Sequence, residues 1–286
     1  MTRHPRPLLA GVMGWPVLHS RSPLMHKHWM TEMGLKGAYV PLAIPPDGLE
    51  TALRALPALG FAGCNLTIPH KQAALAFVDE IDATAHRIGA ISCVAVRPDG
   101  SLFGTNNDWI GFLENLRQAR RGWTAAAGPA VVVGAGGGAR AICHALLQDG
   151  VPELRLVNRN RSRAEALADA FGGPIRVHDW ADRASLLDGA ALLVNCTSLG
   201  MVGNPPLDLP LAALSRAALV ADIVYTPLAT PLIEAARARG NDTVNGLGML
   251  LHQGVPAWQL WFGLTPVVSE DLRRRLEGDI RNALAG

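Results

Sequence analysis

The stretch AVVVGAGGGARAICHALL, residues 130–147, decides the fold class of this chain. Its four apolar residues, Ala130–Val133, are typical of a strand buried in a parallel sheet. The turn that follows at once is Gly134-Ala135-Gly136-Gly137-Gly138-Ala139, and residues 139–149 have a helical pattern. This strand, turn and helix predict a dinucleotide site, in which glycines let the backbone approach a pyrophosphate at a helix N-terminus. The alternative is a glycine-rich turn required only for packing.

A second turn indicates which nicotinamide cofactor is bound. About 20 residues after its first glycine, an NAD enzyme carries a carboxylate for the ribose hydroxyls. Here the strand over 154–157 ends in Asn158-Arg159-Asn160-Arg161-Ser162-Arg163, with three arginines and no acid. Guanidinium groups pair well with a phosphate, so the turn favours NADP over NAD. The alternative is a solvated basic helix start, but the helix dipole disfavours cations there.

Composition bounds the class of protein. The 286 residues are 49% hydrophobic and 17% charged, which suffices for a sizeable core and predicts two domains or one large α/β unit. The net charge of +2 argues against a nucleic-acid or membrane-surface protein. No apolar stretch approaches the ~20 residues of a membrane span, and prolines interrupt the N-terminus where a secretory segment would begin. We therefore expect a soluble, cytoplasmic protein.

Cysteine and histidine positions bear on metals and disulfides. The four cysteines, at positions 64, 93, 143 and 196, form no C-x-x-C pair, so we expect buried free thiols. His26 and His28 stand two residues apart, which places them on different faces of a helix. We therefore predict no metal site.

Strands and helices alternate along the chain. In the first part we predict strands over 8–13, 38–44 and 62–67, helices from Ser22 and over 47–59 and 69–78, and a hairpin over 91–104. In the second part we predict strands over 130–133, 154–157, 192–195 and 219–222, with helices over 108–121, 139–149, 161–171 and 231–239. The fold class is α/β: an N-terminal three-layer α/β substrate domain over 1–107, and a Rossmann-type doubly wound NADP-binding domain over 108–245. We expect the C-terminal helices in 246–286 to pack back on the first domain.

Polar residues of the first part follow its predicted strands, where parallel sheets bind ligands. Ser20 and Ser22 follow the first strand and could bind a carboxylate; the alternative is a helix N-cap by Ser22 alone. Asn65 and Thr67 end the third strand, and Lys71 follows in the first turn of a helix, where the dipole disfavours a cation. Such a local misfit is typical of a functional site, and the alternative is a surface lysine.

Two further polar residues stand apart. Asp108 lies where the two parts join; it is either a helix cap or a partner for Lys71. Gln253 lies inside the nearly wholly apolar helix predicted over 247–262. A buried amide must find partners, which would be a ligand hydroxyl or the backbone.

These residues fall in motifs that resemble those of the shikimate dehydrogenase family over nearly the whole chain. The motifs are, in order, Ser20-Arg21-Ser22-Pro23 (S-[KR]-S-P), Asn65-Leu66-Thr67-Ile68-Pro69-His70-Lys71 (N-[VL]-T-[IV]-P-x-K), Gly104-Thr105-Asn106-Asn107-Asp108 (G-x-N-T-D), Asn158-Arg159 (the opening of N-R-T), and Gly246-Leu247-Gly248-Met249-Leu250 with Gln253 (D-G-x-x-M-L…Q). Several motifs in the same order are far more specific than any one of them.

The resemblance implies an NADPH-dependent, reversible reduction of 3-dehydroshikimate to shikimate, a step in making chorismate and the aromatic amino acids. It implies that Lys71 handles the proton of the reacting oxygen, that Asp108 orients it, and that two units close around the ligands. The implied substrate-binding residues are Ser20, Ser22, Asn65, Thr67, Ser92, Tyr225 and Gln253. The implied cofactor-binding residues are Gly134, Ala135, Gly136, Gly137, Gly138, Ala139, Asn158, Arg159, Asn160, Arg163, Thr197, Ile223 and Gly246. We expect a monomer or homodimer.

The chain departs from the family pattern at several positions. Ala90-Ile91-Ser92-Cys93 stands for A-V-N-T, so Ser92 replaces a substrate-binding asparagine with a hydroxyl of shorter reach. The other departures are Asn107 for threonine, Trp109 for glycine, Asn160 in the third position of N-R-T, and Pro256 inside the Gln253 helix. Ser92 and Trp109 favour one alternative, a paralogue that acts on quinate or a related hydroxylated cyclohexane carboxylate. A second alternative is a non-catalytic NADP-binding regulatory protein, against which the retention of Lys71 and Asp108 argues.

Overall fold

The structure is a computed structural model that describes residues 8–285, and its chain forms two compact units. Unit 1 comprises the described chain up to Asn107 together with Gln253–Leu276, and unit 2 comprises Asp108–His252 together with the residues from Glu277 onward. The C-terminal segment expected to pack on the first unit is therefore divided. Its last part clusters with unit 2, where Ile280 and Leu284 line a cavity of about 390 Å³ with Leu228.

The sheet of unit 1 has six strands in the order β2-β1-β3-β5-β6-β4. The strands are β1 Leu8–Gly14, β2 Gly37–Ala43, β3 Gly63–Leu66, β4 Glu80–Ile81, β5 Cys93–Val96 and β6 Leu102–Thr105. The first three are mutually parallel, whereas β5 is antiparallel to both β3 and β6. The predicted hairpin is confirmed, and the two-residue β4 is too short to leave a sequence pattern.

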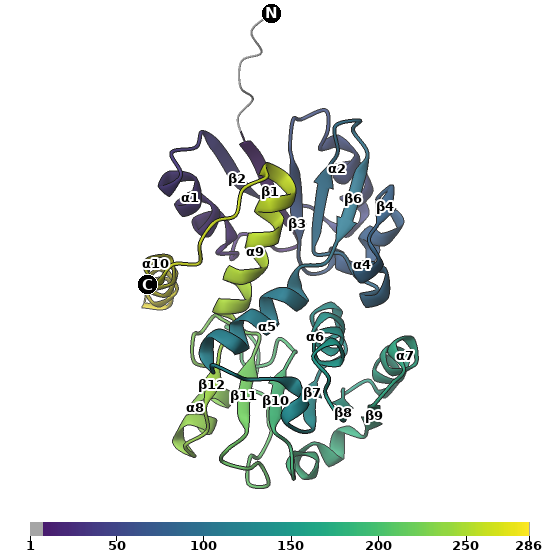
Figure 1. Cartoon of the computed structure of the whole chain (residues 1–286), viewed down its shortest axis with the longest axis vertical. Helices are drawn as coiled ribbons and strands as arrows, with labels where there is room; N and C mark the ends of the chain where they lie inside the picture. Colours follow the sequence, from purple (N-terminus) through teal and green to yellow (C-terminus); the bar gives the residue numbers. More distant parts are fainter. Residues whose placement is uncertain (1–7, 286) are drawn as a thin grey trace, which may run out of the picture. The chain divides into compact units, whose positions relative to one another are not determined.

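Helices cover both faces of this sheet, so the three-layer prediction is confirmed (Figure 1). On one face α2 (Leu49–Ala55) packs with Met13 and Leu66 in a single cluster. On the other face lie α1 (Ser22–Glu32) and the second half of α9 (Leu247–Phe262), with the indole of Trp258 against Trp29.

Two predicted helices of unit 1 are shorter than expected. The helix predicted over 47–59 is a 3₁₀ turn, Pro46–Gly48, followed by α2, which ends at Ala55. Leu56 keeps helical dihedrals, but the proline at position 57 has no N–H with which to continue the helical hydrogen bonds. The helix predicted over 69–78 is the single turn α3 (His70–Ala73) with a 3₁₀ turn after it. The remaining helix, α4 (Ala83–Ile88), is capped by the Asp82 carboxylate, which accepts a hydrogen bond from the Ala85 amide at 2.6 Å.

The sheet of unit 2 has six parallel strands in the order β12-β11-β10-β7-β8-β9. They are β7 Ala130–Val133, β8 Leu154–Val157, β9 Ile175–His178, β10 Leu192–Asn195, β11 Leu219–Asp222 and β12 Thr243–Val244. The chain leaves β7 for β8 on one side and returns to β10 on the other, which is the doubly wound order. The Rossmann-type prediction is therefore confirmed, and the switch point lies between β7 and β10.

Apolar residues of successive strand positions fill both sides of this sheet. Val132 belongs to the cluster that holds Phe112 of α5 (Asp108–Ala119), whereas Val131 and Val133 belong to the cluster that holds Leu232 of α8 (Pro231–Ala238). The other helices are α6 Gly137–Gln148, α7 Arg161–Phe171 and α10 Glu270–Ala285. A strand buried on both faces needs apolar residues at every position, which is why the run over 130–133 has no polar member.

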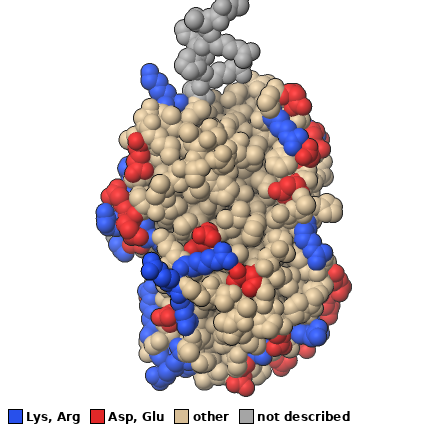
Figure 2. All heavy atoms as spheres, viewed as in Figure 1, with Lys and Arg blue, Asp and Glu red and all other residues tan. Residues whose placement is uncertain are grey.

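Further properties of the described residues agree with the composition. No helix within 8–285 combines the length and apolarity needed to cross a membrane. The four cysteines are buried and free, which confirms that prediction, and burial raises the pKa of Cys143 to about 12. No group of three or more metal-binding side chains is found over the same residues. Basic and acidic side chains are interspersed on the face drawn in Figure 2.

Candidate active site

The glycine loop of unit 2 begins with a residue that the fold itself requires. Gly134 has a φ of +118°, and a Cβ built on it would lie 3.1 Å from the Cys196 backbone and from Cγ2 of Thr197. Its amide donates to the Val157 carbonyl at 2.8 Å. Gly134 therefore makes the tight turn at the switch point, where the loops after β7 and β10 meet.

The second glycine of the motif has no such reason within the protein. Gly136 is the N-cap of α6 at φ −90°, and a Cβ built on it would meet nothing within 4 Å. No side chain caps the start of α6, so none accepts a hydrogen bond from the first-turn N–H groups of this helix. Gly138 is again a packing residue, since its Cβ would lie 3.1 Å from Cδ1 of Ile223. Close packing within the protein thus accounts for glycine at positions 134 and 138, whereas Gly136 leaves room for a ligand.

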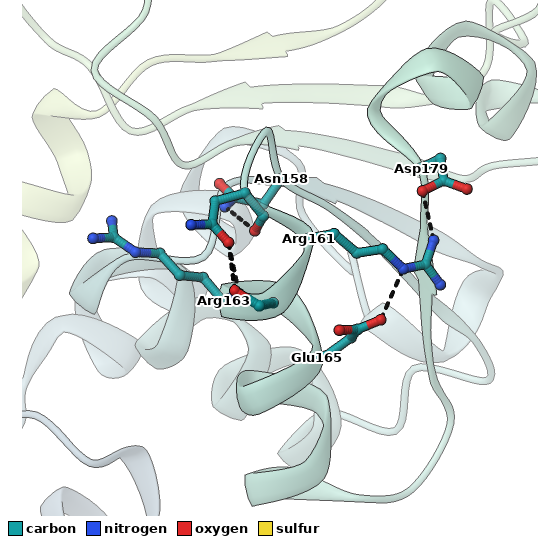
Figure 3. Close-up of polar contacts among 7 residues, drawn as sticks. Asn158, Arg161, Arg163, Glu165 and Asp179 are labelled. Carbon is teal, nitrogen blue, oxygen red and sulfur yellow. Dashed lines mark hydrogen bonds and ion pairs between the residues drawn. The ribbon is translucent and has the colours of Figure 1, made fainter.

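The turn after β8 separates its arginines (Figure 3). The side chain of Arg161 runs toward two carboxylates, donating from Nε to Glu165 at 2.8 Å and from a terminal nitrogen to Asp179 at 2.7 Å. The exposed side chain of Arg163 extends in the opposite direction, and across residues 8–285 neither it nor Arg159 makes a hydrogen bond or ion pair. Local carboxylates therefore hold Arg161, whereas Arg159 and Arg163 are the two arginines that the sequence analysis placed at the cofactor.

The two asparagines of this turn shape its backbone. Asn158 donates from its amide to the Asn160 carbonyl at 2.7 Å. Asn160 is the N-cap of α7, where its Oδ1 accepts from the Arg163 amide at 3.3 Å and from the Ser162 hydroxyl at 2.7 Å. These bonds orient the loop from which the arginine side chains project.

A buried polar network, which the sequence analysis missed, joins the ends of β10 and β11. Asn195 donates to Asp222 at 3.1 Å, and its Oδ1 accepts from both the amide and the hydroxyl of Thr197. The Asp222 carboxylate also accepts from the Val224 amide at 3.0 Å and the Thr230 hydroxyl at 2.7 Å. Burial raises the pKa of Asp222, while these hydrogen bonds act in the opposite direction. A polar residue closing an apolar strand, in both LLVN and LVAD, was the signal available in the sequence.

Two predicted cofactor residues of unit 2, Ile223 and Gly246, lie in direct contact. A Cβ on Gly246 would be 2.0 Å from the carbonyl oxygen of Ile223, and the Gly246 amide donates to the Val224 carbonyl at 3.0 Å. Only glycine fits this approach of two backbones. The half-buried Tyr225 is the next residue of the same loop.

In unit 1 the loops after β1 and β3 lie against each other. The Trp15 amide donates to the Ile68 carbonyl at 3.0 Å, and a Cβ on Gly14 would be 2.4 Å from Cγ2 of Thr67. The alternative role of Ser22, as the N-cap of α1, is wrong: the N-cap is Arg21, and the Ser22 amide donates to Oγ of Ser20 at 3.3 Å.

Asn65 and Gln253 are brought together from distant parts of the sequence. The Asn65 amide nitrogen donates to Oε1 of Gln253 at 3.3 Å and to the Ser92 carbonyl at 3.2 Å. Its Oδ1 accepts from the Tyr39 hydroxyl at 2.8 Å. Asn65 is 4% exposed, so these protein groups occupy the polar atoms of its side chain.

The Ser92 departure has a structural partner. Its hydroxyl accepts from the backbone amide of Asn107 at 2.8 Å, immediately before Asp108 in the chain. The Nδ2 of Asn107 is buried without a hydrogen-bond partner among the described residues.

Trp109 packs edge-on against His144, at 5.5 Å between ring centroids, within the core of unit 2. The size of Trp109 thus serves packing, which weakens it as a sign of another substrate.

The predicted catalytic residues fall in different units. Lys71 is half-buried on α3 of unit 1, and its carbonyl accepts from the Ile91 amide at 2.7 Å. Because α3 has only four residues, its dipole is small and does little to disfavour the Lys71 cation. A local misfit is therefore no longer a reason to place Lys71 in a functional site. Asp108 is the first residue of α5 in unit 2 and is 4% exposed.

The doubly wound sheet, with an uncapped helix behind a glycine loop, defines the class of dinucleotide-binding α/β proteins. Three family profiles match the chain: the shikimate dehydrogenase substrate binding domain over residues 12–94, shikimate / quinate 5-dehydrogenase over 118–201, and the shikimate 5'-dehydrogenase C-terminal domain over 246–269. A protein of Paramagnetospirillum magneticum, named shikimate dehydrogenase (NADP(+)), is 57% identical over 265 residues, which are 93% of this chain and 96% of that protein. This chain belongs to the shikimate dehydrogenase family.

Solved structures give the same family. The shikimate 5-dehydrogenase of Thermus thermophilus, in complex with NADP(H) and shikimate, matches with a TM-score of 0.84 and 39% identity, covering 94% of this chain and 99% of that chain. The quinate dehydrogenase of Corynebacterium glutamicum, in complex with NAD, matches with a TM-score of 0.87 and 33% identity, again over 94% and 99%. The backbone alone therefore does not separate the two substrates or the two cofactors.

Proposed function

We propose that this chain is an NADP-dependent oxidoreductase that interconverts 3-dehydroshikimate and shikimate. The observation that carries the proposal is the 57% identity, over 93% of this chain, to a relative named shikimate dehydrogenase (NADP(+)). The Thermus thermophilus structure, which holds NADP(H) and shikimate, supports the same pair of ligands.

The residues of unit 2 fit a dinucleotide that carries an extra phosphate. The open space at Gly136 and the uncapped start of α6 suit a pyrophosphate, which the first-turn N–H groups would bind. The exposed guanidinium groups of Arg159 and Arg163 suit the 2′-phosphate. Ile223 and Gly246 would border the nicotinamide, and the remaining residues proposed to hold the cofactor are Ala135, Gly137, Ala139, Asn158, Asn160 and Thr197.

The residues of unit 1 would bind the substrate. The hydroxyls of Ser20 and Ser22 would donate to the substrate carboxylate, and Thr67 and Gln253 would contact ring hydroxyls, with Tyr225 of unit 2 adding another. Ser92 can still donate its proton while its oxygen accepts from Asn107, so a substrate contact there remains part of the proposal.

The chemistry divides between cofactor and protein. When bound, the nicotinamide supplies or accepts the hydride. The Lys71 ammonium would donate a proton to the substrate oxygen during carbonyl reduction and take it back during alcohol oxidation. The Asp108 carboxylate would orient that oxygen and the lysine.

The test is to mix the purified protein with NADP and shikimate, then with quinate, and to follow absorbance of the reduced nicotinamide. Turnover of shikimate with little of quinate supports the proposal. Preference for quinate would indicate the paralogue, and NADP binding with no turnover of either would indicate a regulatory protein.

Lys71→Ala tests the acid–base role directly. We expect kcat to fall by about a hundredfold or more, the usual contribution of general acid–base catalysis. The matched control is Lys27→Ala, which removes an exposed ammonium of α1 and should leave kcat unchanged. Unchanged turnover in Lys71→Ala would remove this lysine from the mechanism.

A further inference from the structure

Asp222, the last residue of β11, binds two segments of unit 2 through one oxygen atom. Its Oδ1 accepts from the side-chain NH₂ group of Asn195 at 3.1 Å and from the backbone N–H of Val224 at 3.0 Å. Asp222 is 2% exposed and Asn195 is fully buried, so water has little access to replace either hydrogen bond. One carboxylate oxygen therefore joins the end of β10 to the loop that follows β11.

Asn195 extends this connection to the loop that follows β10. The carbonyl of Leu199, 3.0 Å from Nδ2 of Asn195, can only accept hydrogen bonds, so the NH₂ end of Asn195 faces Leu199 and Asp222. The oxygen of Asn195 then accepts from the backbone N–H of Thr197 at 3.1 Å and from its hydroxyl at 2.7 Å. The position of Thr197 thus depends on Asn195, whose orientation Asp222 helps to fix.

Both segments lie against the glycine loop. Cγ2 of Thr197 would be 3.1 Å from a Cβ built on Gly134. Cδ1 of Ile223, which stands between Asp222 and Val224 in the chain, would be 3.1 Å from a Cβ built on Gly138. The two side chains that flank the glycine loop therefore belong to segments that are held by the same buried carboxylate.

We propose that Asp222 is a positioning residue: by fixing Thr197 and Ile223 beside the glycine loop, its carboxylate shapes the part of unit 2 that binds the nicotinamide half of NADP. Its second oxygen, Oδ2, accepts from the hydroxyl of Thr230, the N-cap of α8, and has no part in this role. The inference rests on the proposed function, because it takes the glycine loop and Ile223 as contacts of NADP.

Asp222→Ala tests the role by removing the acceptor that both segments share. We expect Kd for NADP to rise roughly tenfold or more, because two buried donors lose their partner and the segments that carry them can move. Kd for adenosine 2′,5′-bisphosphate, which has the 2′-phosphate but no nicotinamide, should stay within about twofold of wild type. A general loss of structure in unit 2 would weaken both ligands alike, so calorimetric titration of both separates the two explanations.

Asp222→Asn is the conservative variant. It keeps Oδ1 for Asn195 and Val224, and the new NH₂ group can donate to the hydroxyl oxygen of Thr230. We expect Kd for NADP within about twofold of wild type. An affinity loss as large as that of Asp222→Ala would overturn the proposal, because the charge of Asp222 would then explain the effect.

Asn241→Ala is the matched control at the opposite end of the same strand. Asn241 is 5% exposed, and its NH₂ group donates at 2.8–3.2 Å to three carbonyls that precede β11, those of Ser215, Arg216 and Ala218. Its loss should lower the thermal midpoint and leave both dissociation constants unchanged. An equal rise of Kd for NADP in Asn241→Ala and Asp222→Ala would overturn the proposal.

Thr197→Val gives a second measurement that does not depend on the folding of Asp222→Ala. It removes the hydroxyl that donates to Asn195, and it keeps the branched shape of a half-buried side chain. We expect Kd for NADP to rise roughly threefold to tenfold, the effect of one net hydrogen bond. Wild-type affinity in Thr197→Val, or in a folded Asp222→Ala, overturns the positioning role alone. A wild-type protein that does not bind NADP overturns the proposed function, and the positioning role with it.

Discussion

Gly136→Ala should weaken NADP binding while leaving the free protein nearly unchanged. In the protein, a Cβ at this position meets no atom within 4 Å, and φ of −90° is open to alanine. The substitution also exchanges glycine for alanine at the N-cap of α6, which costs up to about 1 kcal/mol. We therefore expect the thermal midpoint of the free protein to fall by no more than about 4 °C.

The effect on the bound state should be larger. A pyrophosphate held by the first-turn N–H groups must approach within hydrogen-bond distance, about 3 Å, of the backbone that carries the new methyl group. Overpacking by one carbon costs about 1–3 kcal/mol, so Kd for NADP should rise between about fivefold and about 150-fold. The assay is a calorimetric titration of NADP beside thermal denaturation of the ligand-free protein.

Gly246→Ala is the contrasting variant. Its Cβ would lie 2.0 Å from the Ile223 carbonyl oxygen, which is backbone and cannot turn away, so the free protein itself should lose stability. Wild-type NADP affinity in Gly136→Ala would refute the assignment of the pyrophosphate to this loop. A loss of stability at Gly136 equal to that at Gly246 would refute the distinction between the two glycines.

Three further predictions concern single side chains. Arg163→Ala should raise Kd for NADP about tenfold and leave NAD binding unchanged. Arg161→Ala should leave the cofactor preference unchanged, because the Arg161 guanidinium already binds Glu165 and Asp179. Titrations of both variants with both cofactors check this. Ser92→Ala should cost about 1–3 kcal/mol in urea unfolding, because it leaves a buried N–H without an acceptor, and Ser92→Thr should restore most of the loss. Asp222→Asn should flatten the pH dependence of the free energy of unfolding. Burial raises the pKa of Asp222, so the contribution of this side chain to stability is complete below its ordinary pKa of 3.8 and is lost as pH rises through the raised value. A difference in stability between wild type and variant that does not change with pH would contradict this.

Local patterns were sufficient for most of the unit 2 sheet. The strands over 130–133, 154–157, 192–195 and 219–222 and the helix over 161–171 were predicted with their observed bounds, because short, mostly apolar runs between turn residues mark buried strands and apolar residues at helical spacing mark the helix. The strands β9 and β12 were missed. One is only half-buried and the other has two residues, so neither leaves a clear hydrophobic pattern.

Predictions about individual side chains depended on partners distant in sequence. Arg161 and Arg163 look equivalent in the sequence, yet Asp179 accepts a hydrogen bond from Arg161 alone. Asn65 is predicted to bind substrate, and folding also gives it two partners that are distant in sequence, Tyr39 and Gln253. Hydrogen-bond capacity is limited, and the folded chain decides how it is shared.

The amino-acid order by itself determined the two-part α/β architecture, the glycine loop and the basic turn, because apolar periodicity and turn composition are properties of neighbouring residues. Tertiary structure alone decided that Gly136 has open space beside it whereas Gly134 does not, and that Gln253 accepts a hydrogen bond from Asn65. Those outcomes depend on atoms that folding brings within a few ångströms from distant positions in the chain.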